Sequence, residues 1–277
     1  AGTGIVVNNA TSNAVIYAGT LSVTGNRYGI QAQRFYTYGG HGFIFSDNTA
    51  YDSTYCAVKV TDGYVKASHI TAKASTTTSG ANQTDVVAAD LGTYDYIHFY
   101  AKIQLNGYTI TDGMYFQFAS VNVSNTKPTS GGYAYYKDNT LTLHNYTGSS
   151  TANGITHNYD LTVVLDSGTS NSITTSSSDS SSRGIYVQGA LTVQGSGTLS
   201  LYQGQYAIYS TGKLTVTSSK LDCKNSGLYA GGNMTLTNAK ITVGQLGTLA
   251  RLKHAIQSAG SISISGSSTS ITVNSPN

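Results

Sequence analysis

A constant six-residue step between two apolar triplets constrains the fold of this chain more than any other sequence feature. The first triplet carries an apolar residue after a small one, and the second begins with an apolar residue. These two apolar residues lie six apart in every copy, at 155 and 161, 185 and 191, 208 and 214, 228 and 234, and 256 and 262. The distance between copies varies, at 30, 23, 20 and 28 residues. A fixed corner combined with a variable loop is typical of a solenoid.

Alternation within each triplet predicts which side chains point inward. Because successive side chains of a strand point to opposite faces, the central residue of each first triplet is expected inside and the next residue outside. The outward residues of three copies are Tyr186, Tyr209 and Tyr229. A third inward pair follows in most copies, for example Leu221 and Cys223. Three strands per coil predict an all-β fold, a right-handed parallel β-helix with three-strand coils.

The same pattern with longer coils predicts N-terminal β-solenoid coils over residues 1–93. The sequence pattern of residues 28–32 recurs at 56–60 and again at 87–89. The spacing from Ile30 to Val58 is 28 residues. Secondary strands are expected between these copies, at 43–45 and 70–72. Each of them should stack on the next coil.

Residues 94–132 break the pattern and predict a short antiparallel β-meander and connector, inserted in the solenoid. Strand-like segments there are separated by Asn106-Gly107 and Asp112-Gly113, which are two-residue hairpin signals. The C-terminal β-solenoid coils are expected to resume at Tyr133 and to occupy residues 133–277.

Composition favours an all-β chain and gives little support to several kinds of partner. Charged residues make up 10% of the sequence, Glu is absent and the net charge is +3. No basic run interleaved with aromatic residues points to nucleic acid, and no apolar run has the length of a membrane span. The chain opens at Ala1 without methionine, so the lack of a signal peptide is uninformative.

The two cysteines are expected to be buried free thiols. Cys56 and Cys223 fall at inward positions in different halves of the chain. With coils stacked at about 4.8 Å, several coils would separate them, well beyond the ~7 Å limit for a disulfide. An intermolecular bridge is the alternative.

The run Gly132-Tyr133-Ala134-Tyr135-Tyr136-Lys137-Asp138-Asn139-Thr140-Leu141-Thr142-Leu143, followed by the Leu-Thr-Val and Gly-Ile-Tyr coils, carries a resemblance. It resembles secreted Gram-positive surface proteins of the carbohydrate-binding or adhesin-like β-helix type, over about half of the chain. The resemblance implies an extracellular or cell-surface protein with a non-catalytic role.

An enzyme acting on polysaccharide, a lyase or hydrolase, is a distant alternative. Gly40-His41-Gly42 and Arg251-Leu252-Lys253 loosely match fragments of the polygalacturonase-like family. Its Asn-Thr-Asp and Asp-Asp motifs are missing. Since glycoside hydrolysis needs paired carboxylates, we expect no enzymatic activity.

Asp85, Asp90 and Asp95 form the densest acidic stretch and are the candidate metal site. Carboxylate and carbonyl oxygens are the ligands that Ca²⁺ prefers, so a bound Ca²⁺ ion is one interpretation. The competing interpretation is that these aspartates are ordinary turn and cap residues.

Tyr186, Tyr209 and Tyr229 are the candidate binding residues. Stacked one coil apart, they would form an aromatic strip on which sugar rings or another protein could lie. The alternative is an aromatic ladder that only supports the sheet.

Strand-like sequence at both ends of the chain suggests open edges, so either capping segments were trimmed away or other copies cover the ends. Head-to-tail stacking of copies does not close and produces a fibre. We therefore predict a non-catalytic extracellular surface protein that acts by self-association and adhesion, as a filament or cell-surface subunit. The alternative is a polysaccharide-binding β-helix module.

Overall fold

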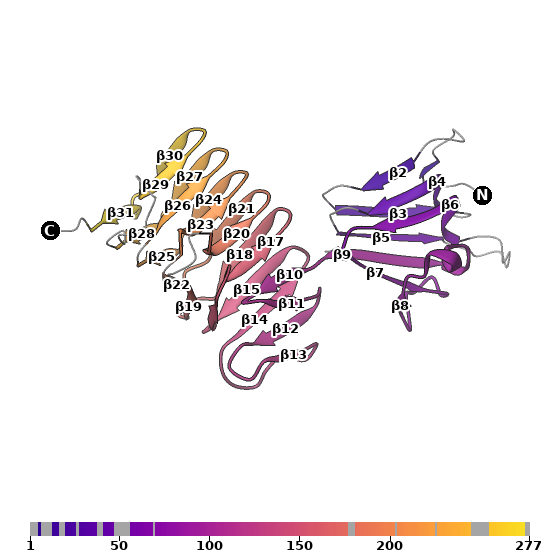
Figure 1. Ribbon diagram of the computed structural model, residues 1–277, viewed down its shortest axis with the longest axis horizontal. Coiled ribbons are helices and arrows are strands. Elements are labelled where there is room, and N and C mark those ends of the chain that lie inside the picture. Colours follow the sequence, from indigo (N-terminus) through magenta and orange to yellow (C-terminus); the bar gives the residue numbers. More distant parts are fainter. Residues whose placement is uncertain are drawn as a thin grey trace. The chain divides into compact units, whose positions relative to one another are not determined.

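The computed structural model describes residues 5–6, 13–16, 20–25, 28–37, 41–46, 56–68, 70–176, 181–202, 204–224, 226–244 and 255–274. The protein is all-β, and the single helix in these ranges is the 3-10 helix η1 (Ala88–Thr93) (Figure 1). None of the described residues form a helix that is long and apolar enough to cross a bilayer. The chain divides into two compact units, Ala1–Lys102 and Ile103–Asn277.

The second unit contains three sheets, C, D and E, which the chain visits in turn (Figure 1). From residue 155 onward, each set of three consecutive strands adds one strand to each sheet. Sheet C receives β17 (Ile155–His157), β20 (Arg183–Val187), β23 (Tyr206–Ser210), β26 (Gly227–Ala230) and β29 (Ile256–Ser258). Sheet D receives β18 (Leu161–Leu165), β21 (Leu191–Gln194), β24 (Leu214–Thr217), β27 (Met234–Thr237) and β30 (Ile262–Ser265). Sheet E receives β19 (Ser170–Thr175), β22 (Thr198–Tyr202), β25 (Lys220–Cys223), β28 (Lys240–Val243) and β31 (Ser270–Val273).

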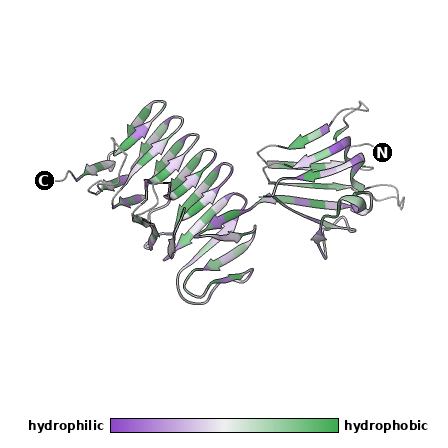
Figure 2. Cartoon of the chain, viewed as in Figure 1, coloured by the Kyte–Doolittle hydropathy of each residue, from purple (hydrophilic) through white to green (hydrophobic). Residues whose placement is uncertain are grey.

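Each of these strands pairs in parallel with its counterpart in the next set, and the register confirms the predicted inward columns. Ile185 is the partner of Ile208, which is in turn the partner of Leu228. In sheet D, Leu214 lies between Leu191 and Met234. All these side chains are buried in one continuous core, and Figure 2 shows the hydrophobic residues recurring along the strands.

A column of glycines lies at the step from sheet C to sheet D in consecutive sets of strands. Gly189, Gly212 and Gly232 occupy this corner in consecutive sets, and the amide of each later glycine donates a 2.9 Å hydrogen bond to the carbonyl oxygen of the one before. A Cβ atom on Gly212 would lie 2.8 Å from the carbonyl carbon of Gly189. Close backbone approach therefore favours glycine at this corner.

The corner from sheet D to sheet E uses left-handed backbone in every set. The residues with positive φ there are Asn145, Gly168, Gly195, Ser218, Asn238 and Gly266. Glycine and asparagine tolerate this conformation, whereas a serine in it is unusual. Ser218 (φ 56°) is thus the exception in the series.

Antiparallel strands close one end of the second unit. In sheet C, β10 (Ile103–Leu105) pairs antiparallel with both β17 and β11 (Tyr108–Ile110). In sheet D, antiparallel pairing runs through β13 (Asn122–Ser124), β12 (Met114–Gln117), β14 (Tyr133–Lys137) and β15 (Thr140–His144). Parallel pairing begins at β15 with β18, and at β16 (Thr147–Ser150) with β19.

These strands confirm one predicted hairpin and correct two expectations. The Asn106-Gly107 turn joins β10 to β11, with positive φ at both residues as a two-residue hairpin turn requires. The hairpin predicted at Asp112-Gly113 is wrong, because β11 belongs to sheet C and β12 to sheet D. Parallel coils also do not resume at Tyr133, since β14 forms an antiparallel hairpin with β15 through Asp138 and Asn139.

The first unit contains a parallel sheet A and a mixed sheet B. In sheet A, the long strand β4 (Tyr28–Thr37) pairs with β1 (Ile5–Val6), β2 (Asn13–Ile16) and β6 (Cys56–Lys66). Ile30 is the partner of Val58, so the 28-residue repeat is confirmed. The third copy expected at 87–89 is wrong, because η1 starts there. Alanine and leucine in this segment favour helix over strand.

Sheet B differs from the expected stack of parallel coils. Its strands are β3 (Thr20–Gly25), β5 (His41–Ser46), β9 (Tyr96–Ala101), β7 (Ile70–Ser75) and β8 (Thr84–Asp85), in that order. β9 lies between β5 and β7 and runs antiparallel to both. The predicted meander segment 94–132 is therefore divided, with β9 in the first unit and the strands from β10 on in the second.

Cys56 and Cys223 are both buried and neither forms a disulfide. The expected burial of both thiols is confirmed.

Candidate functional site

The three predicted tyrosines lie side by side on the outer face of sheet C. Tyr186 is the register partner of Tyr209, which is the partner of Tyr229. The rings of Tyr209 and Tyr229 stack with centroids 4.6 Å apart and planes 16° apart. The Tyr186 ring is tilted by 48° to that of Tyr209 at 5.8 Å. All three side chains are half-buried.

Two residues missed by the sequence analysis complete this surface, which we call the tyrosine patch (Arg183, Tyr186, Tyr206, Tyr209 and Tyr229). The Tyr206 ring lies 5.1 Å from that of Tyr209 and 5.6 Å from that of Tyr229. The Arg183 guanidinium carbon lies 4.9 Å from the ring centroid of Tyr186 and 4.7 Å from that of Tyr209. Such cation–π contacts hold the guanidinium group against the rings.

Broken alternation explains why Arg183 and Tyr206 were missed. In β20 and β23, two consecutive residues are buried before each outward tyrosine, Gly184 with Ile185 and Ala207 with Ile208. Residues three apart therefore share the outer face. The sequence did contain a signal, since Arg183 and Tyr206 each stand three residues before a tyrosine of the strip.

Polar residues flank the tyrosine patch on the neighbouring strands of sheet C. In register, Thr156 precedes Tyr186, and Gln257 follows Tyr229. The amide of Gln188 donates a 3.1 Å hydrogen bond to the hydroxyl of Tyr186. Ring faces offer apolar contact and phenolic hydroxyls offer hydrogen bonds, so the patch suits a ligand with alternating apolar and hydroxyl-bearing surface.

The structure does not bring the three aspartates of the candidate metal site together. Asp85 pairs with Lys73 at 2.8 Å, and this ammonium group lowers the pKa of the Asp85 carboxyl. Asp90 is exposed in the first turn of η1. Asp95 is half-buried, which raises the pKa of its carboxyl. Within the described ranges, no three His, Cys, Asp or Glu side chains are grouped so that they could hold a metal ion.

A second aromatic cluster lies on the antiparallel part of sheet D. The imidazole of His144 stacks on the ring of Tyr133 at 4.9 Å, and its Nδ1 lies 3.1 Å from an oxygen of Asp166. The Lys127 ammonium group lies 5.6 Å from the centroid of the same Tyr133 ring. Lys127, Tyr133 and His144 line a hollow of about 410 Å³, together with residues 128–132 and Asn145.

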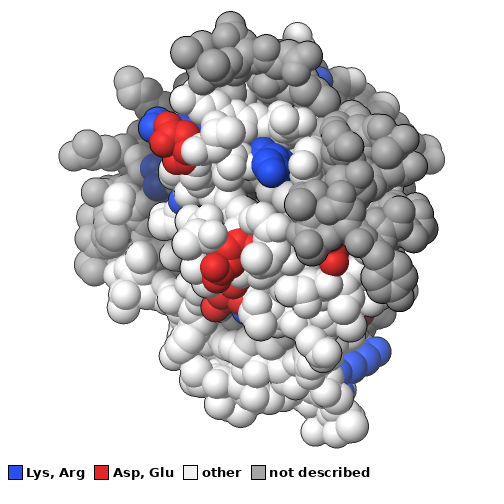
Figure 3. Space-filling model, turned by 90° about the vertical axis from the view of Figure 1, so that its right-hand side faces the viewer, with Lys and Arg blue, Asp and Glu red and all other residues white. Residues whose placement is uncertain are grey.

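Charged groups are sparse on the visible part of the surface. On the face shown in Figure 3, small groups of charged side chains are separated by uncharged ones. Of the enzyme-like fragments, residues 251–253 lie outside the described residues, as does the side chain of His41.

No family model matches the chain, and neither the curated proteins nor the solved structures contain a match to it.

Proposed function

We propose that this chain is a right-handed parallel β-helix of a secreted, cell-surface protein, and that it acts by adhesion without catalysis. The tyrosine patch is its contact face, and polysaccharide is the class of ligand. The observation that carries this proposal is the clustering of four tyrosines and Arg183 on the outer face of sheet C.

The arrangement of the patch supports binding over a purely structural ladder. A supporting ladder needs only the in-register tyrosines, whereas Tyr206 and Arg183 widen the aromatic surface beyond the column. Rigid aromatic side chains give large contact area at a small cost in conformational entropy. The in-register repeat also suits a polymer, because successive units of a chain can meet equivalent positions on successive strands.

Binding of soluble and arrayed glycans tests this function. Tyr209 contacts all four other members of the patch, so Tyr209→Ala should weaken binding by about tenfold, in keeping with the energy of a lost aromatic contact and its buried area. Tyr202→Ala is the matched control, because Tyr202 is 38% exposed and lies on β22 in sheet E. Equal glycan affinities of the two variants would show that the tyrosine patch is not the binding surface.

Self-association is a second candidate, favoured by the last set of strands. The columns that are buried elsewhere in sheets D and E end in exposed residues, with Ile262 at 46%, Ile264 at 57% and Val273 at 51%. Leu236, the partner of Ile264, is fully buried. A second copy docked on β29–β31 would remove this apolar surface from water.

Sedimentation velocity and negative-stain microscopy test self-association. Concentrated protein should form dimers or filaments, and Ile264→Ser should shift it toward monomers. Val65→Ser is the control, since Val65 is 45% exposed in the first unit. Monodisperse single copies at every concentration would contradict this candidate.

A further inference from the structure

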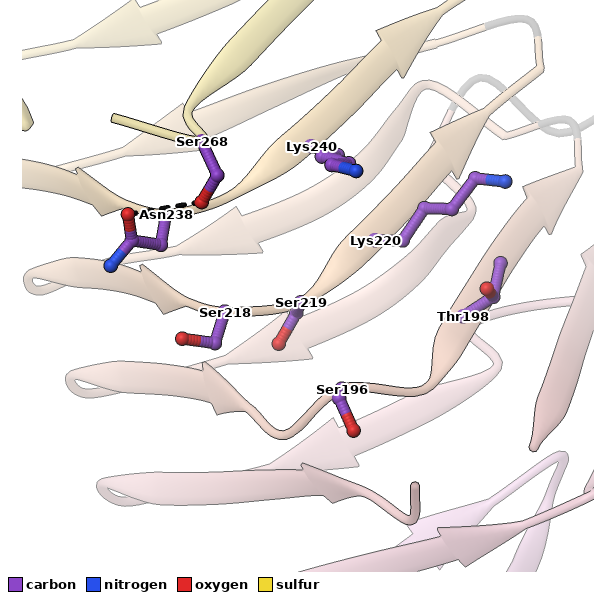
Figure 4. A pocket seen from close by; sticks show the side chains of 8 residues that line it. All are labelled: Ser196, Thr198, Ser218, Ser219, Lys220, Asn238, Lys240 and Ser268. Atoms are coloured by element: carbon purple, nitrogen blue, oxygen red, sulfur yellow. Dashed lines mark hydrogen bonds between the residues drawn. The ribbon is translucent and has the colours of Figure 1, made fainter. Parts of the chain in front are cut away.

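A hollow of about 500 Å³ lies along the corner where the chain passes from sheet D to sheet E. It crosses consecutive sets of strands, and its lining is polar. We call it the lysine trough and define it by Ser196, Thr198, Ser218, Lys220, Asn238 and Lys240 (Figure 4). It lies on a different sheet from the tyrosine patch.

Two lysines on neighbouring strands dominate the charge of the trough. Lys220 on β25 is the register partner of Lys240 on β28, and both are exposed. Figure 4 shows their side chains extending to the same side of the two strands. Neighbouring strands are about 4.8 Å apart, and like charges directly opposite each other destabilise a sheet.

No carboxylate in the described part of the chain compensates these two ammonium groups. The outer neighbours of the pair are hydroxyl residues, Thr198 beside Lys220 and Ser270 beside Lys240. Asp222 lies on the same face of β25, but its carboxylate pairs with Lys224 at 2.5 Å. An anion in the trough would relieve the repulsion between Lys220 and Lys240.

Hydrogen-bonding groups surround the lysines on successive sets. Ser196, Ser218 and Asn238 occupy the corner before β22, β25 and β28. The Asn238 side-chain oxygen accepts a 3.0 Å hydrogen bond from the hydroxyl of Ser268, so its amide NH₂ group is left to donate. The repeat of hydroxyl and amide groups runs from strand to strand, in the same direction as the lysine pair.

We propose that the lysine trough binds an acidic polysaccharide, with carboxylate groups of consecutive sugar units held by Lys220 and Lys240 and sugar hydroxyls by the serines and Asn238. Charge-assisted hydrogen bonds from the ammonium groups provide the main attraction. The site is separate from the tyrosine patch and does not depend on the function proposed for it.

The composition of the trough favours polysaccharide over nucleic acid. Single-stranded nucleic acids are held by aromatic side chains that stack on bases, together with an extended basic groove. The residues lining the trough include no aromatic side chain, and its cations are Lys220 and Lys240.

Titration calorimetry at low ionic strength, with polygalacturonate as the probe, tests the proposal. The double variant Lys220→Gln/Lys240→Gln should lose affinity by about tenfold or more, because two charge-assisted contacts disappear. The control Lys137→Gln/Lys213→Gln removes the same charge from the same unit. Lys137 lies on β14 in sheet D and Lys213 precedes β24, and neither lines the trough. This control should bind within about twofold of the unaltered protein, as expected for distant exposed charges.

Three results would overturn the proposal. Equal losses in the two double variants would show a general effect of net charge. Equally tight binding of dextran, a neutral polymer, would show that the anionic groups are not recognised. Tighter binding of a single-stranded oligonucleotide through the same lysines would assign the trough to nucleic acid. Tyr209→Ala should leave polygalacturonate binding intact, which keeps this test distinct from that of the tyrosine patch.

Discussion

The hydroxyl oxygen of Tyr136 lies 2.9 Å from Nε2 of His157, and both side chains are buried. Nδ1 of His157 lies 3.0 Å from the carbonyl oxygen and 3.4 Å from the amide nitrogen of Tyr159. Burial raises the pKa of the Tyr136 phenol, and its hydroxyl donates a 3.1 Å hydrogen bond to Oδ1 of Asn139. The pair thus joins β14, an antiparallel strand, to β17, where the parallel part of sheet C begins.

Replacing Tyr136 with Phe should lower the free energy of unfolding by roughly 1–3 kcal/mol, because Nε2 of His157 would be left buried without its hydrogen-bond partner. Urea unfolding followed by circular dichroism measures this loss. Tyr135→Phe is the control, since Tyr135 is half-buried on the opposite face of the same strand. Similar losses in both variants would mean that the hydrogen bond contributes nothing specific.

In the buried column of sheet D, the stability lost on truncating a side chain should depend strongly on the position of that side chain. Leu214→Ala should cost about 2–5 kcal/mol, the usual range for a cavity in a packed core. Ile262→Ala changes the same column two sets later, where the side chain is 46% exposed, and should cost roughly 1 kcal/mol or less. Thermal unfolding of both variants provides the comparison, and an equal cost would be inconsistent with the observed burial.

The glycine column predicts that one added methyl group disrupts the corner. In Gly212→Ala the new Cβ would meet the backbone of Gly189 at 2.8 Å, and backbone cannot move aside as a flexible side chain can. We expect a loss of about 1–3 kcal/mol, as for other overpacked sites. Gly92→Ala is the control because its Cβ would meet nothing within 4 Å. Unchanged stability of Gly212→Ala would show that the corner can accommodate a Cβ atom.

Ser218 predicts a stabilising exchange. Its φ of 56° is strained for an L-residue other than asparagine or aspartate. Ser218→Asn, which copies Asn238 in the next set, should raise the free energy of unfolding by roughly 0.5–1 kcal/mol. The reverse exchange, Asn238→Ser, should lower it by a similar amount. Chemical denaturation measures both, and a shift of the same sign in the two variants would contradict the strain argument.

The thiol of Cys223 should be unreactive in the folded protein. Burial raises its pKa to about 12, and burial also raises the pKa of Cys56. The thiolate is the reactive form, so alkylation by iodoacetamide at about pH 8 should be very slow until the protein unfolds. Mass spectrometry with and without urea counts the alkylated thiols. Rapid native labelling of Cys223 would show that its strand opens readily.

The regular part of the second unit was predictable because its signal is local. The six-residue step places Ile185, Ile208 and Leu228 in one column whatever the length of the loops between them. The close packing at the corner between sheets C and D was not recognised beforehand. Gly189, Gly212 and Gly232 were present in the sequence, but their close approach becomes evident only when successive corners stack.

Long-range pairing explains what the sequence did not reveal. β9 has the same alternation whether it joins a hairpin with its neighbours or enters sheet B between β5 and β7. Alternation in sequence specifies a face and not a partner. The tyrosine patch was predicted in part, since strict alternation gave Tyr186, Tyr209 and Tyr229 but assigned no role to Tyr206 or Arg183.

The antiparallel strands at one end of the second unit limit how such an array can lengthen. A duplicated set of three strands inserted after β17 would find parallel neighbours on both sides in sheets C, D and E. The same insertion before β15 would meet β14, which runs in the opposite direction. Homologous proteins of different size should therefore differ in the number of sets beyond β17, while the antiparallel strands β10 to β15 stay constant.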